Sequence, residues 1–252
     1  MAAVALALAA GLAGCAATPN AAPPGGNAAA TGFAAAGETR WSRVTFELGR
    51  AAYDEEQAIA RDPRWAAPHA RLAQIFAAQG DTAAALAEAE TAARLDPKNP
   101  LYADDLGDLA RRVGDLARAE RAYEAARRAD PADWQAAWGL GLVAVARRQW
   151  GPAARWLRLA LLLGGPRGTV DDAFGQLYAA SGDVPEAAAY FAAAVAADPG
   201  WWQPYYDRAA LEARLGQRAA ALADLRRALA RQPASGAAFE LYRKLAEAAP
   251  TP

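Results

Sequence analysis

The chain has 252 residues, enough for one large domain or an array of repeats. Its formal net charge of −1 offers no attraction to nucleic acid or anionic lipid, and paired arginines such as Arg147–Arg148 are interpreted as solvated helix faces balanced by nearby acids. One cysteine and one histidine exclude a disulfide framework within the chain and a zinc site built from these two residue types.

Residues 1–14 are apolar or small throughout and are predicted to be a signal peptide. The run is shorter than the ~20 residues that a permanent bilayer span needs, and it ends in Leu12–Ala13–Gly14–Cys15. This ending resembles the lipobox of bacterial lipoproteins, in which the cysteine thiol is alkylated with diacylglycerol and the peptide is cut before it. The resemblance implies that Cys15 is the lipidation site. A basic segment before the apolar run is missing, and an ordinary secretory signal with a chance cysteine is the alternative.

Residues 15–38 are predicted to be a lipid-anchored flexible linker. They consist almost entirely of Ala, Pro, Gly, Asn and Thr, a composition that cannot bury a core. Ala16 follows the cysteine, and in Gram-negative lipoproteins an aspartate at that place favours the inner membrane. The resemblance therefore implies a lipid-anchored protein of the cell envelope, at the outer membrane and facing the periplasm.

A 34-residue period runs through the rest of the chain. The prolines of its Asp-Pro pairs stand 34, 34 and 68 residues apart, at Asp62–Pro63, Asp96–Pro97, Asp130–Pro131 and Asp198–Pro199. When columns are counted from residues 66, 100, 134, 168 and 202, the eighth column holds only glycine or alanine: Ala73, Gly107, Gly141, Gly175 and Ala209. Helix axes about 8–10 Å apart leave no room for a long side chain where the helices cross. The period and the small columns resemble the tetratricopeptide repeat, a pair of antiparallel helices.

The resemblance implies an all-α fold, a right-handed superhelical solenoid of five to six repeats plus a capping helix. We assign five repeats to residues 66–233, a degenerate N-terminal repeat or cap to residues 39–65, and a C-terminal capping helix and tail to residues 234–252. Glycine ends the first helix of four repeats, as at Gly114. The repeat from Trp134 has Arg148–Gln149 there, and we expect an irregular turn.

Catalytic chemistry finds little support in the sequence. His69 is the only histidine, and no motif completes a Cys–His or Ser–His–Asp set with it. Asp104, Asp105 and Asp108 lie within one helical turn, but the ligand spacing of an EF-hand is absent. We therefore predict no enzyme, no cofactor, no metal, no small-molecule substrate and no nucleic-acid partner.

The expected partner is a protein or peptide held in a concave groove, which the family lines with its first helices. The candidate residues for this groove are Asp104, Asp108, Trp138, Leu142, Asp172 and Tyr206. An apolar, aromatic centre flanked by acids suits a segment with an apolar anchor and one or more Arg or Lys. The lysine and asparagine clamp of the chaperone-binding members is absent. Trp138 filling its own repeat's core is the alternative.

Together these features predict a membrane-anchored scaffold for protein–protein interaction in the bacterial cell envelope. Two narrower alternatives stay open: a pilotin-like assembly factor for a type IV pilus secretin, and an adaptor for peptidoglycan enzymes. The chain resembles both in build, and no motif chooses between them.

Overall fold

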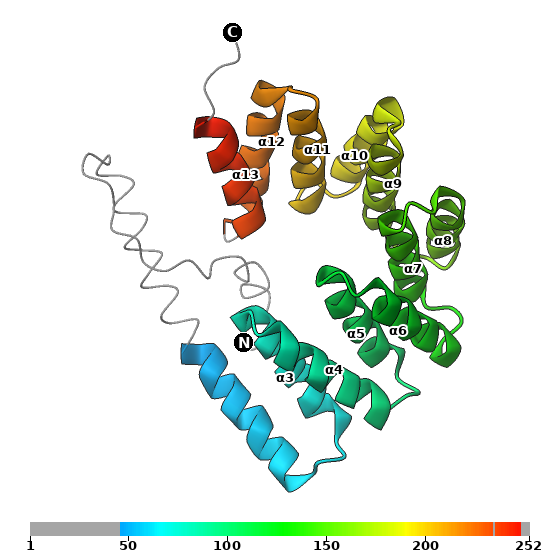
Figure 1. The fold of residues 1–252 in the computed structure, drawn as a ribbon, viewed down its shortest axis with the longest axis vertical. Coiled ribbons are helices and arrows are strands. Elements are labelled where there is room, and N and C mark those ends of the chain that lie inside the picture. Colours follow the sequence, from blue (N-terminus) through cyan, green and yellow to red (C-terminus); the bar gives the residue numbers. More distant parts are fainter. Residues whose placement is uncertain (1–45, 234, 248–252) are drawn as a thin grey trace, which may run out of the picture. The chain divides into compact units, whose positions relative to one another are not determined.

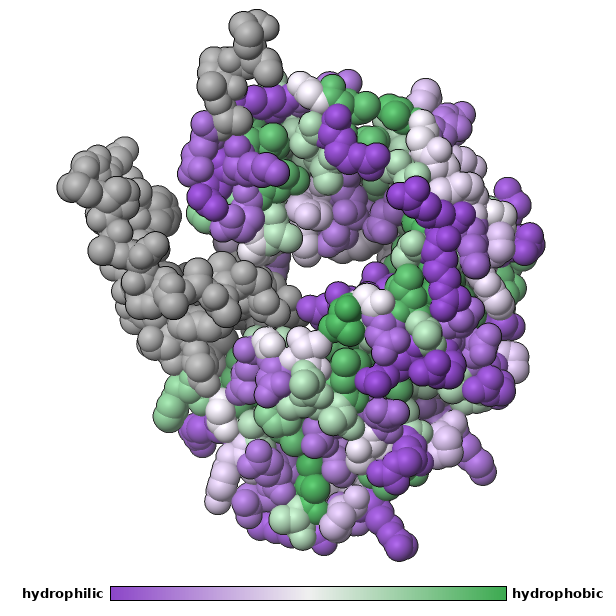
Figure 2. Space-filling model, in the orientation of Figure 1, coloured by the Kyte–Doolittle hydropathy of each residue, from purple (hydrophilic) through white to green (hydrophobic). Residues whose placement is uncertain are grey.

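The computed structural model describes residues 46–233 and 235–247, and within these ranges every regular element is a helix (Figure 1). The signal peptide, Cys15, the linker and the first residues of the predicted cap lie outside the described residues. The chain divides into two compact units, Met1–Leu95 and Asp96–Pro252. None of the described helices is both long and apolar enough to span a membrane. On the face drawn in Figure 2, hydrophobic residues form separate patches among hydrophilic ones.

The first unit contains a helix over residues 46–61, followed by α3 (Ala66–Gln79) and α4 (Thr82–Leu95). α3 and α4 pack as a pair. Leu48 and Ala52 of the first helix belong to one buried apolar cluster with Leu72 and Ile75 of α3. The helix over residues 46–61 therefore covers a face of the first repeat that would otherwise meet water.

The second unit continues the helix pairs in chain order: α5 (Pro100–Arg112), α6 (Leu116–Ala129), α7 (Trp134–Ala146), α8 (Trp150–Leu162), α9 (Arg167–Ser181), α10 (Val184–Ala197), α11 (Gln203–Arg214), α12 (Arg218–Arg231) and α13 (Gly236–Glu247). Each first helix contacts its own second helix and the first helix of the next pair. The second helices of this unit make no substantial contact with one another. Because a curved stack is compressed on its inner side, α5, α7, α9 and α11 line the concave face. The predicted all-α repeat fold is confirmed.

The eighth column marks the closest approach of the two helices in a repeat. At Gly141, an added Cβ would lie 2.6 Å from Cδ2 of Leu157, far inside van der Waals contact. The same pairing of a glycine with a fully buried large side chain recurs in neighbouring repeats, as Gly107 with Tyr123 and Gly175 with Phe191. Tyr123 also lies against Gly139 of the following repeat. The prediction that this column is small because the helices cross there is confirmed.

The turn inside each repeat closes with the same backbone hydrogen bond. Asp115 N–H donates to the carbonyl of Ala110, and Gln149 N–H donates to the carbonyl of Ala144, both at 2.9 Å. Gly114, which lies between Ala110 and Asp115, takes a φ of +82°. Arg148 takes a φ of +58° and is the one non-glycine residue with positive φ in the described ranges. The prediction of an irregular turn at Arg148–Gln149 is therefore wrong. Arg148 adopts the left-handed backbone conformation that glycine adopts in the other repeats.

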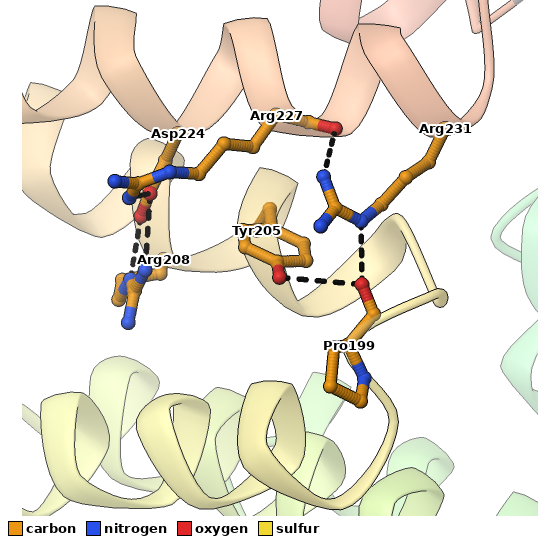
Figure 3. A network of polar contacts seen from close by, with 6 residues as sticks. All are labelled: Pro199, Tyr205, Arg208, Asp224, Arg227 and Arg231. Carbon is orange, nitrogen blue, oxygen red and sulfur yellow. Dashed lines mark hydrogen bonds and ion pairs between the residues drawn. The ribbon is translucent and has the colours of Figure 1, made fainter.

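A network of polar contacts joins the two helices of the last repeat (Figure 3). Asp224 is 2% exposed, and its carboxylate accepts hydrogen bonds from Arg208 at 2.5 and 3.0 Å and from Arg227 at 2.7 Å. The hydrogen bonds to Asp224 raise the pKa of Arg208. Arg231 and Tyr205 both donate to the carbonyl of Pro199, at 2.5 and 3.3 Å. Two guanidinium groups thus pair with one buried carboxyl group.

Candidate partner-binding surface

The fifth column places one side chain per first helix in a row along the concave face. Its members alternate between an acid and an aromatic ring: Asp104 on α5, Trp138 on α7, Asp172 on α9 and Tyr206 on α11. Consecutive first helices are in contact, so equivalent positions lie side by side. The structure therefore brings four of the six predicted groove residues into one row.

The other two predicted groove residues have structural roles. Asp108 accepts a hydrogen bond from the Tyr123 hydroxyl at 2.5 Å and lies 3.6 Å from the guanidinium of Arg111. Leu142 is 5% exposed and belongs to the apolar core between α7, α8 and α9. These contacts leave Asp108 partly available to a partner, whereas Leu142 supports the groove from beneath.

Asp104 forms a carboxyl pair with Asp133, which caps the N-terminus of α7. Asp104 is 5% exposed, and no N–H donor reaches either of its oxygens. One oxygen of Asp133 accepts the backbone N–H of Gln135 at 2.8 Å, while the other lacks an N–H donor. Burial, and then hydrogen bonding to and repulsion from Asp133, raise the pKa of Asp104 to about 9, with repulsion from Asp108 and Asp105 adding to this. At neutral pH Asp104 therefore keeps its proton and can donate it to Asp133.

A second carboxyl pair joins α9 to α11. The side-chain amide of Gln176 donates to Asp172 and to Asp207, each at 3.0 Å, and that of Gln203 donates to Asp207 at 3.2 Å. Burial raises the pKa of Asp172 well above its ordinary value, and burial also raises that of Asp207 to about 6. Asp172 is 3% exposed, and its second oxygen has no hydrogen-bond partner. Burial therefore favours the protonated form in this pair as well.

Trp138 lies between the two acid pairs with its polar edge unpaired. Its ring is partly buried against the core around Leu142, so it fills part of that core as the alternative interpretation proposed. Its indole N–H has no acceptor, and the Nε–H of Arg111, whose guanidinium lies 5.7 Å from the ring centroid, also has none. Buried donors without acceptors are uncommon in folded proteins. Both donor atoms are buried, so a bound main-chain carbonyl would reach them only after the two side chains move.

Asp133 and Asp207 were missed by the sequence interpretation, whereas Arg111 stands in a groove column but was not among the candidate residues. Asp133 lies in the turn before a helix, and Asp207 is one residue beyond the fifth column, so neither stands in a groove column. Only Asp133 left a signal in the sequence, because it is an acid that closely follows the third Asp-Pro pair. His69 is explained by a hydrogen bond of 2.6 Å between its Nδ1 and a carboxyl oxygen of Glu88. Among the described residues, no three His, Cys, Asp or Glu side chains are placed to hold a metal ion.

Comparisons with known proteins agree with the helical repeat fold. Family models described as tetratricopeptide repeat match residues 66–99, 105–168 and 173–201, together about half of the chain. A comparison with curated proteins found no match.

Solved structures share the fold at low sequence identity. TTC0263, a thermophilic protein of Thermus thermophilus, is 21% identical with a TM-score of 0.64, over 72% of this chain and 97% of that one. A repeat protein from Parabacteroides merdae is 20% identical with a TM-score of 0.60, over 80% and 85%. The Cut9–Hcn1 hetero-tetramer of the APC/C gives 19% identity and a TM-score of 0.61, and the match covers 81% of this chain and only 40% of that one. These likenesses show the fold alone.

Proposed function

Because the chain belongs to the tetratricopeptide repeat family, whose members mediate protein–protein interaction, we propose that its concave face binds a segment of a partner protein. The observation that supports this most is the alternating row of acids and aromatic rings, with the Trp138 indole N–H and the Arg111 Nε–H left unpaired beside it. A half-buried aromatic anchor commonly contributes about 2 kcal/mol or more to binding. Members of this family are generally non-catalytic scaffolds, which favours binding over catalysis here.

The bound segment carries an apolar side chain and one or more Arg or Lys. Trp138 and Tyr206 supply the apolar contacts. Asp104 and Asp172 supply acceptors, and their neighbours in the two carboxyl pairs are acids rather than cations. A basic side chain arriving beside either pair would meet unneutralised oxygens, which gives specificity as well as attraction.

Site-specific photo-crosslinking in cells tests this proposal. A photoreactive residue replaces Leu101, which is the second residue of α5 and is 54% exposed, and in a matched chain it replaces the exposed Glu124 on α6. We expect a partner to crosslink from position 101 and not from position 124. Trp138→Ala and Asp104→Arg should each reduce the crosslink without unfolding the chain. Equal crosslinking from both positions, or undiminished crosslinking in both variants, would place binding outside the concave face.

Membrane anchoring through Cys15 is the second part of the proposal. It is supported by Leu12–Ala13–Gly14 directly before the only cysteine of the chain. Cys15→Ser should abolish incorporation of labelled fatty acid and release the protein from the membrane fraction, while Ala17→Ser should do neither. Ala16→Asp should move the lipidated protein from the outer to the inner membrane. A Cys15→Ser chain that stays lipid-labelled would contradict the anchor.

The crosslinked partner also decides between the two envelope roles. A secretin subunit would favour the pilotin-like role in type IV pilus assembly, and a peptidoglycan hydrolase or synthase would favour the adaptor role. Neighbouring genes offer an independent and inexpensive indication. The described residues favour neither role over the other.

A further inference from the structure

The third repeat differs from its neighbours in charge. Between Asp133 and Asp171 the sequence contains no Asp or Glu, although the chain as a whole has a net charge of −1. The same stretch contains five arginines: Arg147, Arg148, Arg155, Arg158 and Arg167. Four of them lie on α8 or in the turn before it. This stretch of α8 and the turn before it therefore carries positive charge with no acid beside it in the sequence, in a nearly neutral chain.

Three of these arginines are not neutralised. Arg147 pairs with Glu120 at 2.7 Å, and Arg167 pairs with Asp171 at 3.4 Å. Arg148, Arg155 and Arg158 are exposed, and no carboxylate in the described part of the chain lies within ion-pair distance of them. The interpretation that Arg147–Arg148 is balanced by nearby acids therefore holds for Arg147 and is wrong for Arg148.

Arg148 is held in an unfavourable backbone conformation. Its φ of +58° occurs at the place where the other four repeats carry a glycine, such as Gly114 with φ of +82°. A side chain in this region costs about 1 kcal/mol or more, which glycine avoids. An arginine kept where glycine would relieve strain points to a use for its side chain.

The exposed residues of α8 follow a single line along the convex face. Gly151, Arg155, Arg158 and Leu162 are separated by four, three and four residues, which is one helical stripe of about 16 Å. Leu162 is 83% exposed, more than any other large hydrophobic side chain in the described ranges. A straight stripe along one outward-facing helix can touch a flat surface along its whole length.

We propose that this α8 face, formed by Arg148, Arg155, Arg158 and Leu162, rests on an anionic lipid bilayer. The arginines lie over the anionic headgroups and Leu162 enters the boundary of the acyl chains, the arrangement that interfacial amphipathic helices use. The α8 face is on the opposite side of the unit from the concave row. It requires neither the groove partner nor the lipid on Cys15, and it leaves the groove open while the protein lies on a membrane.

Vesicle co-sedimentation of the full chain carrying Cys15→Ser tests the proposal without any acyl chain. The probe is equimolar phosphatidylglycerol and phosphatidylcholine, compared with phosphatidylcholine alone. We expect binding only to the anionic vesicles. Each arginine is worth about fivefold in affinity, so the triple variant R148Q/R155Q/R158Q should bind on the order of 100-fold more weakly. The control R112Q/R121Q/R128Q removes the same charge from exposed sites on α5 and α6 and should lose far less.

The variant Leu162→Ser distinguishes binding to a bilayer from binding to an acidic protein. This variant should bind the anionic vesicles several-fold more weakly, while its affinity for soluble polyglutamate should not change. Circular dichroism of each variant should match that of the parent. Equal losses in the two arginine triples, binding to neutral vesicles, or full vesicle binding by Leu162→Ser would each overturn the proposal.

Discussion

The last repeat and the central repeats both bury carboxyl groups, but the groups that surround these carboxyls differ. In the last repeat, Asp224 lies between the guanidinium groups of Arg208 and Arg227, and both of its carboxylate oxygens are paired. In the central repeats, Asp104 faces another acid, and the indole N–H of Trp138 beside it is unpaired. A buried acid with cations around it stabilises the fold. A buried acid without them is a cost that a bound partner can remove.

The largest expected effect comes from breaking the paired acid. Asp224→Ala leaves the largely buried guanidinium of Arg208 without its counter-charge and should lower the free energy of unfolding by about 3 kcal/mol. Urea unfolding followed by circular dichroism at pH 7 measures this. Glu124→Ala, which removes an exposed partner of Arg128 at 4.0 Å, should change little. A small loss in Asp224→Ala would mean that the paired acid is no more structural than the unpaired one.

The unpaired acid should instead appear in the pH dependence of stability. The folded chain holds the Asp104 proton up to about pH 9, whereas an unfolded aspartate releases it near its ordinary value of 3.8. The folded state therefore binds more protons in this window, and its stability must fall as pH rises. We expect a loss on the order of 2 kcal/mol between pH 5 and pH 8, measured by urea unfolding.

Asp104→Asn provides the control for this pH effect. Asparagine resembles the protonated carboxyl and can still donate to Asp133, so its stability at pH 5 should lie within about 0.5 kcal/mol of the parent. Most of the decline toward pH 8 should disappear, and the remainder should come from Asp172 and Asp207. A parent chain whose stability rises from pH 5 to pH 8 would show that Asp104 is ionised and paired.

The smallest effect concerns the strained turn of the third repeat. Arg148→Gly removes the side chain from a backbone with φ of +58° and should raise the free energy of unfolding by about 1 kcal/mol, measured by urea unfolding at pH 7. The same substitution should weaken binding to anionic vesicles. A variant that is less stable than the parent would show that Arg148 contributes to the fold in the way that Arg208 does.

The fold could be predicted because close helix crossings constrain single positions. Gly141 must be small since Leu157 occupies the space where its Cβ would lie, and the same constraint returns every 34 residues. Such a constraint is visible in one sequence without any knowledge of three-dimensional contacts. The turn at Arg148 was predicted less well, because composition alone did not indicate that the hydrogen bond from Gln149 to Ala144 would hold an arginine in a left-handed conformation.

The candidate site could be predicted only in part. The row from Asp104 to Tyr206 could be predicted because its members recur at one column. Their partners could not be predicted, because the contact of Asp104 with Asp133 and that of Asp172 with Asp207 depend on how one repeat stacks on the next. Burial of Leu142 likewise depends on how α7 packs against α8 and α9, which the columns of a single repeat do not show.

Tyr123 restricts how the gene for this chain can change. Its ring fits against Gly107 of its own repeat and against Gly139, the sixth residue of the next one. Losing residues 134–167, one full period, would bring Ala173 to the place of Gly139 and set a methyl group against that ring. Repeat arrays commonly gain and lose units by recombination, since each unit contacts only its neighbours. In this chain the contact of Tyr123 with Gly139 opposes that deletion, so these two repeats are not freely interchangeable with the repeats that follow.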